Sequence, residues 1–95
     1  MDTIRTLNPA NGELIAELPV DGQQSVDAAV ERAVEGQRSW GRMTGTERGR
    51  ILRRTADILR SRNAELAQLE TRDTGKPIQE TIAVDVLSGA DCLDY

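Results

Sequence analysis

The chain has 95 residues, a formal net charge of −4, no histidine and one cysteine. This composition excludes an internal disulfide and a zinc site of the usual Cys/His kind, and the mixing of arginines with acidic residues disfavours a nucleic-acid partner. No apolar run approaches the ~20 residues of a membrane span, and no secretory signal is visible at the start. We therefore expect a cytoplasmic protein with no membrane association.

Residues 1–20 are predicted to form a β-hairpin. Its strands are expected over residues 3–7 and 13–18. Between them, Pro9 fixes one backbone angle and Asn11-Gly12 tolerates positive φ, as a reversing turn requires. Pro19 is expected to end the second strand, because proline cannot donate a hydrogen bond to the ladder.

A first helix is predicted to follow, with Ser25 as its N-cap and Gly36 weakening its end. Trp40 is expected to fold back over the apolar face of this helix from a loop that runs to Thr44. The apolar residues recur at the spacing of one buried helical face. They are Val26, Ala29, Val30, Ala33 and Val34.

A second, longer helix is predicted to open with a capping box formed by Thr44 and Glu47, and to be kinked or recapped near Asn63. Gly75 is expected to end it, and Pro77 suits the first turn of a third helix. The apolar face of the second helix comprises Ile51, Leu52, Thr55, Ile58, Leu59, Leu66 and Leu69. The chain is thus expected to be mainly α-helical, with an N-terminal hairpin followed by about three helices that form a layer over residues 25–95.

The third helix has apolar residues on several sides, which indicates burial against partners that this chain hardly supplies. Asp91 and Asp94 lie in its last turn, where the helix dipole favours positive side chains. From this ending we expect the sequence to be a truncated piece of a longer polypeptide.

No residue of the chain carries a convincing pattern of catalytic or cofactor chemistry. Cys92 is flanked by carboxylates that disfavour its thiolate, and the chain has no histidine to act as a base, so we interpret it as a buried structural cysteine. Thr74-Gly75-Lys76 lacks the upstream glycine and the following Ser or Thr of a phosphate-binding loop, and it is interpreted as a turn between helices. The Gly-x-Gly-x-x-Gly pattern of a dinucleotide cradle does not occur.

The arginines from Arg48 to Arg62 leave two interpretations open. They form either a docking face for another domain, since arginine combines planar hydrogen bonding with apolar contact, or a solvated helix face with local ion pairs. In the second case the expected pairs are Glu47 with Arg50, and Arg54 with Asp57.

Four stretches, in this order, resemble the N-terminal region of the aldehyde dehydrogenase family. They are residues 8–13 (NPANGE), 40–43 (WGRM), 47–54 (ERGRILRR) and 69–77 (LETRDTGKP). Three further stretches are most similar to the family's betaine aldehyde dehydrogenases: residues 56–60 (ADILR), 62–67 (RNAELA) and 88–95 (SGADCLDY). The resemblance covers essentially the whole chain.

The resemblance implies an α/β parent enzyme that oxidises betaine aldehyde to glycine betaine with NAD(P), and that forms a dimer or tetramer. Residues 1–95 would be an incomplete N-terminal part of its NAD-binding domain. The family's nucleophilic cysteine, glutamate base, oxyanion asparagine and dinucleotide-binding strands lie beyond residue 95. The resemblance therefore places no catalytic and no cofactor-binding residue in this chain, and the 95 residues alone are expected to be inactive.

One site of the family reaches into this segment. Betaine aldehyde dehydrogenases similar to this sequence hold a potassium ion between the strand before the Asn-Pro motif and the aspartate of the Asp-Thr-Gly-Lys motif. The resemblance therefore implies a potassium site with backbone carbonyls of Thr6 and Leu7 and the carboxylate of Asp73 as ligands, and oxygen ligands suit such a hard cation. Since the other ligands would come from missing residues, the isolated chain is expected to bind potassium poorly.

Two alternatives remain. The parent enzyme acts on another aldehyde, such as a semialdehyde or an aminoaldehyde, or the chain is a stand-alone helical interaction module that has kept the family's sequence without its chemistry. The substrate pocket lies outside the 95 residues, so the downstream sequence decides the substrate.

Overall fold

The structure is a computed structural model of the chain, and it describes residues 2–95. Residue 1 of the predicted hairpin region therefore lies outside the described residues. Strands β1 (Thr3–Leu7) and β2 (Leu14–Pro19) form an antiparallel hairpin that leads into helix α1 (Gln23–Arg42). Helices α2 (Gly45–Ser61) and α3 (Asn63–Thr74) follow. The last helix runs through α4 (Ile78–Glu80), the π-helical segment η1 (Thr81–Asp85) and α5 (Val86–Asp94).

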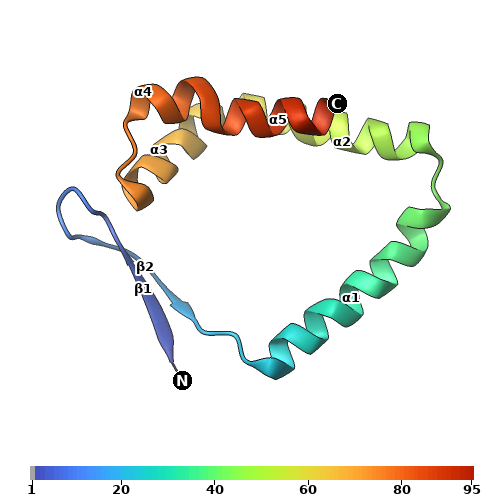
Figure 1. The fold of residues 1–95 in the computed structure, drawn as a ribbon, viewed down its shortest axis with the longest axis horizontal. Coiled ribbons are helices and arrows are strands. Elements are labelled where there is room, and N and C mark those ends of the chain that lie inside the picture. Colours follow the sequence, from blue (N-terminus) through green and yellow to red (C-terminus); the bar gives the residue numbers. More distant parts are fainter. Residues whose placement is uncertain (1) are drawn as a thin grey trace.

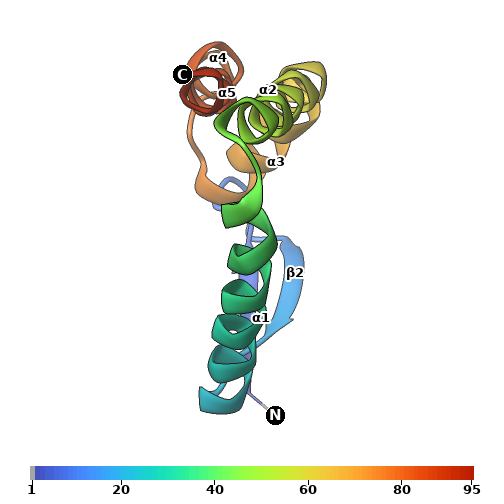
Figure 2. The same ribbon diagram turned by 90° about the vertical axis from the view of Figure 1, so that its right-hand side faces the viewer.

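The elements lie in a thin, open layer. Figure 1 shows α1 and the hairpin on opposite sides below the region where α5 runs along α2, joined by the segment between β2 and α1, and Figure 2 shows how narrow the arrangement is from the side. The radius of gyration is 17.2 Å, compared with about 12 Å for a compact domain of this length. The accessible surface is 7408 Å², compared with roughly 5,400 Å² for a compact monomer of this mass. Many apolar side chains are therefore exposed at the surface of the layer.

The predicted hairpin is confirmed, with the second strand shifted by one residue. Thr6 lies opposite Ala16, but Leu7 lies opposite Leu14, so Ile15 is an extra residue on β2. Such a bulge disrupts the ladder locally and bends the strand. The turn has a φ of 75° at Gly12, as the Asn-Gly pair predicts.

Helix α1 differs from the prediction at both ends. It begins at Gln23 after Gly22 as N-cap, so Ser25 is not the cap and the helical layer begins before residue 25. It also continues through Gly36 to Arg42, and Trp40 belongs to the helix instead of folding back from a loop. A glycine costs a helix interior only about 1 kcal/mol relative to alanine, which the good helix formers around Gly36 outweigh.

The start of α2 confirms the predicted capping box. The Glu47 amide donates to Thr44 Oγ1 at 3.1 Å, and the Thr44 amide donates to Glu47 Oε2 at 2.9 Å. The predicted kink near Asn63 is a break between two helices, at a residue whose backbone leaves the helical region, Arg62. Gly75 ends α3 with a φ of 79°, as expected.

The third predicted helix corresponds to α4, η1 and α5, which continue one another. Pro77 precedes its first residue as the N-cap, with a ψ of 137°, and does not occupy the first turn. The Pro77 carbonyl still accepts hydrogen bonds from the amides of Glu80 and Thr81, at 3.0 and 3.1 Å. The mainly helical fold with an N-terminal hairpin is confirmed.

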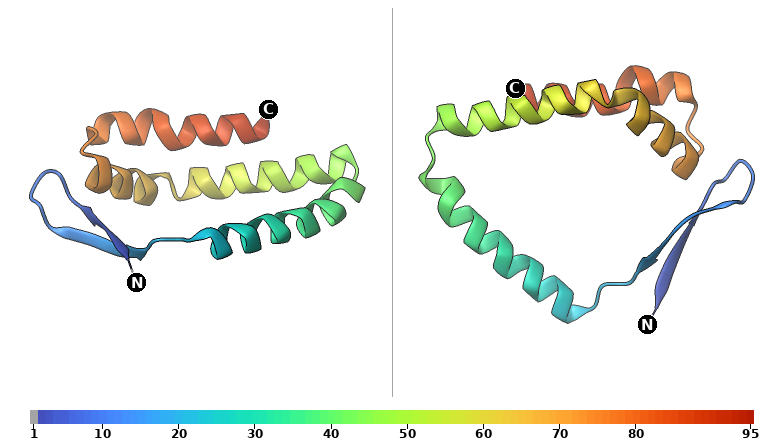
Figure 3. Two further views of the ribbon diagram at one scale, coloured as in Figure 1. Left: turned by 60° about the horizontal axis from the view of Figure 1, so that its bottom comes forward. Right: turned by 180° about the vertical axis from the view of Figure 1, so that it is seen from behind.

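Burial is concentrated where α2, α3, η1 and α5 meet. Figure 3 shows α5 lying along α2 from two further directions. The fully buried side chains among the described residues are small: Ala56, Ala67, Thr81 and Ala90. The apolar face predicted for the second helix is largely uncovered, since Ile58 and Leu69 are each 50% exposed. The periodic pattern therefore marks a real face that this chain does not itself cover.

Candidate functional site

A pocket of about 600 Å³ lies between the hairpin and the helical layer. Its wall is mostly apolar and is made by residues of β1, β2, α2, α3 and α5. The lining residues are Thr6, Ile15, Ala16, Leu18, Leu59, Leu66, Leu69, Glu70, Asp73, Val86 and Gly89. The hairpin also touches the loop after α3, because a Cβ atom on Gly75 would lie 3.0 Å from Pro9 Cγ. Both this contact and the positive φ require glycine at position 75.

Two of the three residues implied as potassium ligands line this pocket. Thr6 is half-buried on β1, with its hydroxyl donating to the Ala16 carbonyl oxygen at 3.4 Å, and Asp73 is exposed in the last turn of α3. Leu7 lies next to Thr6 but does not line the pocket, and it is 48% exposed. The structure therefore brings Thr6 and Asp73 to one pocket and leaves the Leu7 side chain outside its wall.

The chemistry of these groups fits a hard cation better than a transition metal. They offer carboxylate, hydroxyl and main-chain oxygens and no nitrogen or sulfur ligand. The strand irregularity falls between Thr6 and Leu7, where main-chain groups are less committed to the ladder. Within residues 2–95, however, no group of three or more His, Cys, Asp or Glu side chains is placed to hold a metal ion. A cation at this position would therefore need oxygen ligands in addition to the carboxylate of Asp73.

A charged cluster lies beside the pocket and was not predicted from the sequence. Lys76 Nζ donates to both carboxylate oxygens of Asp85 at 2.9 Å. The Lys76 ammonium, followed by a hydrogen bond from Glu70, holds the pKa of Asp85 below its ordinary value. The hydrogen bond to Asp85, aided by burial, raises the pKa of Glu70. The Lys76–Asp85 pair joins the loop after α3 to the end of η1. The two residues are not at a helical spacing, so the sequence alone does not indicate the pair.

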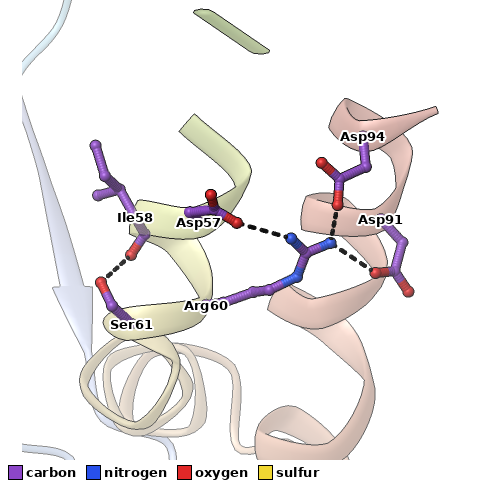
Figure 4. Close-up of polar contacts among 6 residues, drawn as sticks. All are labelled: Asp57, Ile58, Arg60, Ser61, Asp91 and Asp94. Atoms are coloured by element: carbon purple, nitrogen blue, oxygen red, sulfur yellow. Dashed lines mark hydrogen bonds and ion pairs between the residues drawn. The ribbon is translucent and has the colours of Figure 1, made fainter. Parts of the chain in front are cut away.

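A second unpredicted contact joins α2 to the end of α5. Figure 4 shows the Arg60 guanidinium among three carboxylates: Nη1 donates to Asp57 at 3.2 Å, and Nη2 donates to Asp91 at 3.0 Å and to Asp94. Hydrogen bonds to Asp94 and then to Asp91 raise the pKa of Arg60. The two aspartates that appeared misplaced in the last helical turn therefore have a partner from another helix.

Three sequence interpretations of charged and polar residues require correction. The expected pair of Glu47 with Arg50 gives way to the capping box, and Asp57 binds Arg60 instead of Arg54. Cys92 is exposed, so its interpretation as a buried cysteine is wrong. It directly follows Asp91, one of the aspartates that bind Arg60.

Lys76 also argues against a phosphate-binding role for its motif. Its ammonium is held by Asp85, and Gly75 serves as the C-cap of α3, so the segment is a turn between helices as predicted. Among residues 2–95, no helix is long and apolar enough to cross a membrane.

Comparisons with known proteins agree with this fold. The sequence pattern of the aldehyde dehydrogenase family matches residues 1–95. The chain superimposes with a TM-score of 0.93 and 40% identity on an aldehyde dehydrogenase from Burkholderia cenocepacia, covering 99% of this chain and 19% of that one. It is also similar to PnpE in complex with nicotinamide adenine dinucleotide, with a TM-score of 0.94, 36% identity and coverage of 99% and 19%.

A third similar structure is the gamma-glutamyl-gamma-aminobutyraldehyde dehydrogenase from Burkholderia cenocepacia J2315, with a TM-score of 0.92 and 34% identity over 97% of this chain and 19% of that one. The chain thus belongs to the aldehyde dehydrogenase family. It spans about a fifth of the length of the solved structures it matches.

Proposed function

We propose that this chain is the N-terminal part of the NAD-binding domain of an NAD(P)-dependent aldehyde dehydrogenase. The observation that carries the proposal is the family match over residues 1–95, together with the close likeness to a relative in complex with nicotinamide adenine dinucleotide. In this proposal the parent is a dimer or tetramer that oxidises a small aldehyde. The catalytic and coenzyme-binding groups belong to the parent's remaining sequence.

The thin shape of the chain supports a role as one layer of a larger domain. The chain exposes roughly 2,000 Å² more surface than a compact monomer of its mass would, an area comparable to an obligate protein interface. Val26, Val30 and Val34 on one face of α1 are each more than half exposed. In the parent, we expect the coenzyme-binding part to cover such faces.

Betaine aldehyde is our first candidate substrate, since three stretches of the chain resemble betaine aldehyde dehydrogenases. Two of these stretches, residues 56–60 and 88–95, contact each other through Arg60, Asp91 and Asp94. An aminoaldehyde is the second candidate, because a relative that is 34% identical is named for a gamma-aminobutyraldehyde derivative.

A kinetic comparison distinguishes these substrates. Reading the encoding gene beyond the codon for Tyr95 is expected to give a frame with a downstream catalytic cysteine and glutamate. The parent protein should then form NADH from betaine aldehyde with a higher kcat/KM than from gamma-aminobutyraldehyde derivatives, and the 95-residue chain should form none. The reverse preference would assign the aminoaldehyde, whereas a genuine stop codon with a defined binding partner would favour the interaction module.

We also propose that the parent holds potassium with the main-chain carbonyls of Thr6 and Leu7 and the carboxylate of Asp73. The shared pocket of Thr6 and Asp73 and the irregular pairing at Leu7 support this assignment. Potassium is expected to raise the Tm of the parent relative to sodium at equal ionic strength. Asp73→Asn should abolish that difference, while Asp21→Asn, at an exposed carboxylate between β2 and α1, should retain it. An unchanged potassium effect in the Asp73 variant would remove Asp73 from the ligand set.

A further inference from the structure

The last helix contains a π-helical interruption at a defined place. Segment η1 (Thr81–Asp85) lies between α4 and α5, with helical residues on both sides. A π turn closes its hydrogen bonds over one more residue than an α turn, and such insertions are frequently found at functional sites. Residues of α5 are therefore displaced by one position compared with an uninterrupted α-helix.

Three polar contacts reach η1 from α3 or from the loop after it. Asn63 Nδ2 donates to the Ile82 carbonyl at 2.8 Å, and the hydroxyls of Thr71 and Thr81 lie 2.9 Å apart. The third contact is the Lys76–Asp85 ion pair at 2.9 Å. Because a π turn disturbs the regular ladder, a side-chain donor to one of its carbonyls stabilises the interrupted form directly.

The hydrogen bond from Asn63 to the Ile82 carbonyl carries an energetic cost for the Asn63 side chain. Its Oδ1 atom is buried and has no hydrogen-bond partner among the described residues. A buried acceptor without a partner is unfavourable, and without the bond from Nδ2 the amide group would rotate to expose its oxygen atom to water. The bond from Nδ2 to the Ile82 carbonyl therefore fixes the orientation of the amide.

If η1 rewound as a regular α-helix and kept all its residues, α5 would occupy a different register on α2. Each residue would move to the place of the next one, a rotation of about 100° and a rise of about 1.5 Å. Ala90 and Leu93 would then face Arg60 in place of Asp91 and Asp94. Gly89 would enter the buried place of Ala90, and both are small enough to fit there.

We propose that η1 is a two-register element, in which Asn63 and the Lys76–Asp85 pair act as positioning groups that keep α5 in the observed register on α2. Releasing these contacts lets α5 move forward by one residue and separates Arg60 from Asp91 and Asp94. Val86 and Gly89 on α5 line the pocket that also contains Thr6 and Asp73. The register of α5 therefore also sets which side chains form that wall of the pocket.

A distance between two spin labels reports the register. One label is placed on the native, exposed Cys92 of α5, and the other on α2 through Arg53→Cys at an exposed position. In this otherwise unchanged chain, pulsed electron paramagnetic resonance should give one narrow distance. The combined variant Asn63→Ala with Lys76→Met should add a second distance that differs by several ångströms, because a side chain rotated by about 100° around a helix changes its direction.

Two further variants keep the test decisive. Arg62→Met removes the ion pair between Arg62, at the start of α3, and Glu65 at 2.8 Å, and neither residue contacts η1. This variant should retain the single spin-label distance. Deleting Ala83 removes the extra residue itself, so α5 should keep its place, and the combined variant should no longer produce a second distance. The proposal is overturned by a broad distribution in the chain with native Asn63 and Lys76, by an unchanged distance in the combined variant, or by loss of α5 helicity in circular dichroism.

Discussion

The N-terminal half of the chain, up to the end of α1, and the C-terminal half, from α2 to α5, both form helices but differ in how many side chains they bury. Helix α1 is the longest, with 20 residues, yet none of its residues is buried. Every fully buried side chain of the described region lies on α2, α3, η1 or α5. Local sequence is therefore sufficient to define a helix and its apolar face, but it does not determine whether that face is covered within the same chain.

The difference has a consequence for stability. Most helical stability in proteins comes from packing of the apolar face, and a helix without such packing is marginal in water. The C-terminal half has this packing, whereas α1 has its own hydrogen bonds, exposed contacts such as the Arg38–Glu35 pair and, at its end, a hydrogen bond from the Arg48 guanidinium to the Trp40 carbonyl oxygen at 3.5 Å. Substitutions at the buried positions of the C-terminal half should therefore be costly, and substitutions on α1 should be nearly neutral.

The largest expected effect comes from enlarging a buried alanine. Ala90→Leu adds three carbon atoms at a fully buried position on α5, and overpacking typically costs about 1–3 kcal/mol. Ala33→Leu makes the same change on the exposed face of α1 and should shift the free energy of unfolding by less than about 0.5 kcal/mol. Urea unfolding of both variants measures the contrast. Equal losses would mean that the face of α1 is covered as well.

A buried hydroxyl pair should give the next largest effect. Thr81 is fully buried, and its hydroxyl pairs with that of Thr71 at 2.9 Å. Thr81→Val leaves the Thr71 hydroxyl without this partner and is expected to cost about 1–3 kcal/mol. Adding Thr71→Val should recover part of the loss, because both polar groups are then removed.

Thr55→Val is the matched control for this pair. The Thr55 hydroxyl bonds only to the Ile51 carbonyl of its own helix, and the residue is exposed. Its replacement should change the free energy of unfolding by less than about 0.5 kcal/mol. If the double variant Thr71→Val with Thr81→Val loses as much stability as the two single variants added together, the two hydroxyls act independently.

Helix caps test the comparison at the junction between the halves. Thr44→Ala removes the capping box of α2 and should cost about 1 kcal/mol. Ser25→Ala, at the position that sequence analysis predicts as the cap of α1, should be nearly neutral because Ser25 lies inside the helix and makes no capping bond. Thermal unfolding of the two variants measures this difference. A comparable loss at Ser25 would restore it as the cap.

Features that depend on neighbouring residues were predicted well. The capping box at Thr44, the left-handed Gly75 and the turn at Gly12 each rest on a short pattern with one dominant physical cause. The start of α1 was missed because Ser25 and Gly22 offer competing signals, and Gly36 was overvalued as a helix breaker. The π turn of η1 has no local signature at all, since its stabilising contacts come from Asn63, Thr71 and Lys76.

The candidate site shows the same limit. Thr6 and Asp73 were brought together by a family resemblance, and the structure places both on one pocket. Glu70, Lys76 and Asp85 could not be grouped from the sequence, because Lys76 and Asp85 are joined across a turn and a π segment. Burial of Cys92 was mispredicted for a related reason: an apolar residue on a helix was assumed to have a neighbour that this chain does not supply.

The smallest expected effect is the pH dependence of the Glu70, Lys76 and Asp85 cluster, which has no counterpart on α1. The folded-state pKa of Asp85 lies below its ordinary value of 3.8, so its stabilising contribution is present above that value and is lost as the pH falls through the folded pKa. The pKa of Glu70 is raised above 4.5, so its contribution is complete below that value and is lost as the pH rises through the folded pKa.

The two carboxyl groups therefore act on opposite sides of a narrow pH window. Asp85→Asn should flatten the stability profile on both sides, because Asp85 also causes the raised pKa of Glu70, whereas Glu70→Gln should flatten mainly the decline on the less acidic side, since Lys76 still lowers the pKa of Asp85. Glu35→Gln on α1 leaves the cluster intact and should preserve both limbs. Urea unfolding at a series of pH values tests these signs. Asp85 is the last residue of η1. A change in the spin-label distance at a pH where the chain is still folded would therefore indicate that protonation shifts the register of α5 before the chain unfolds.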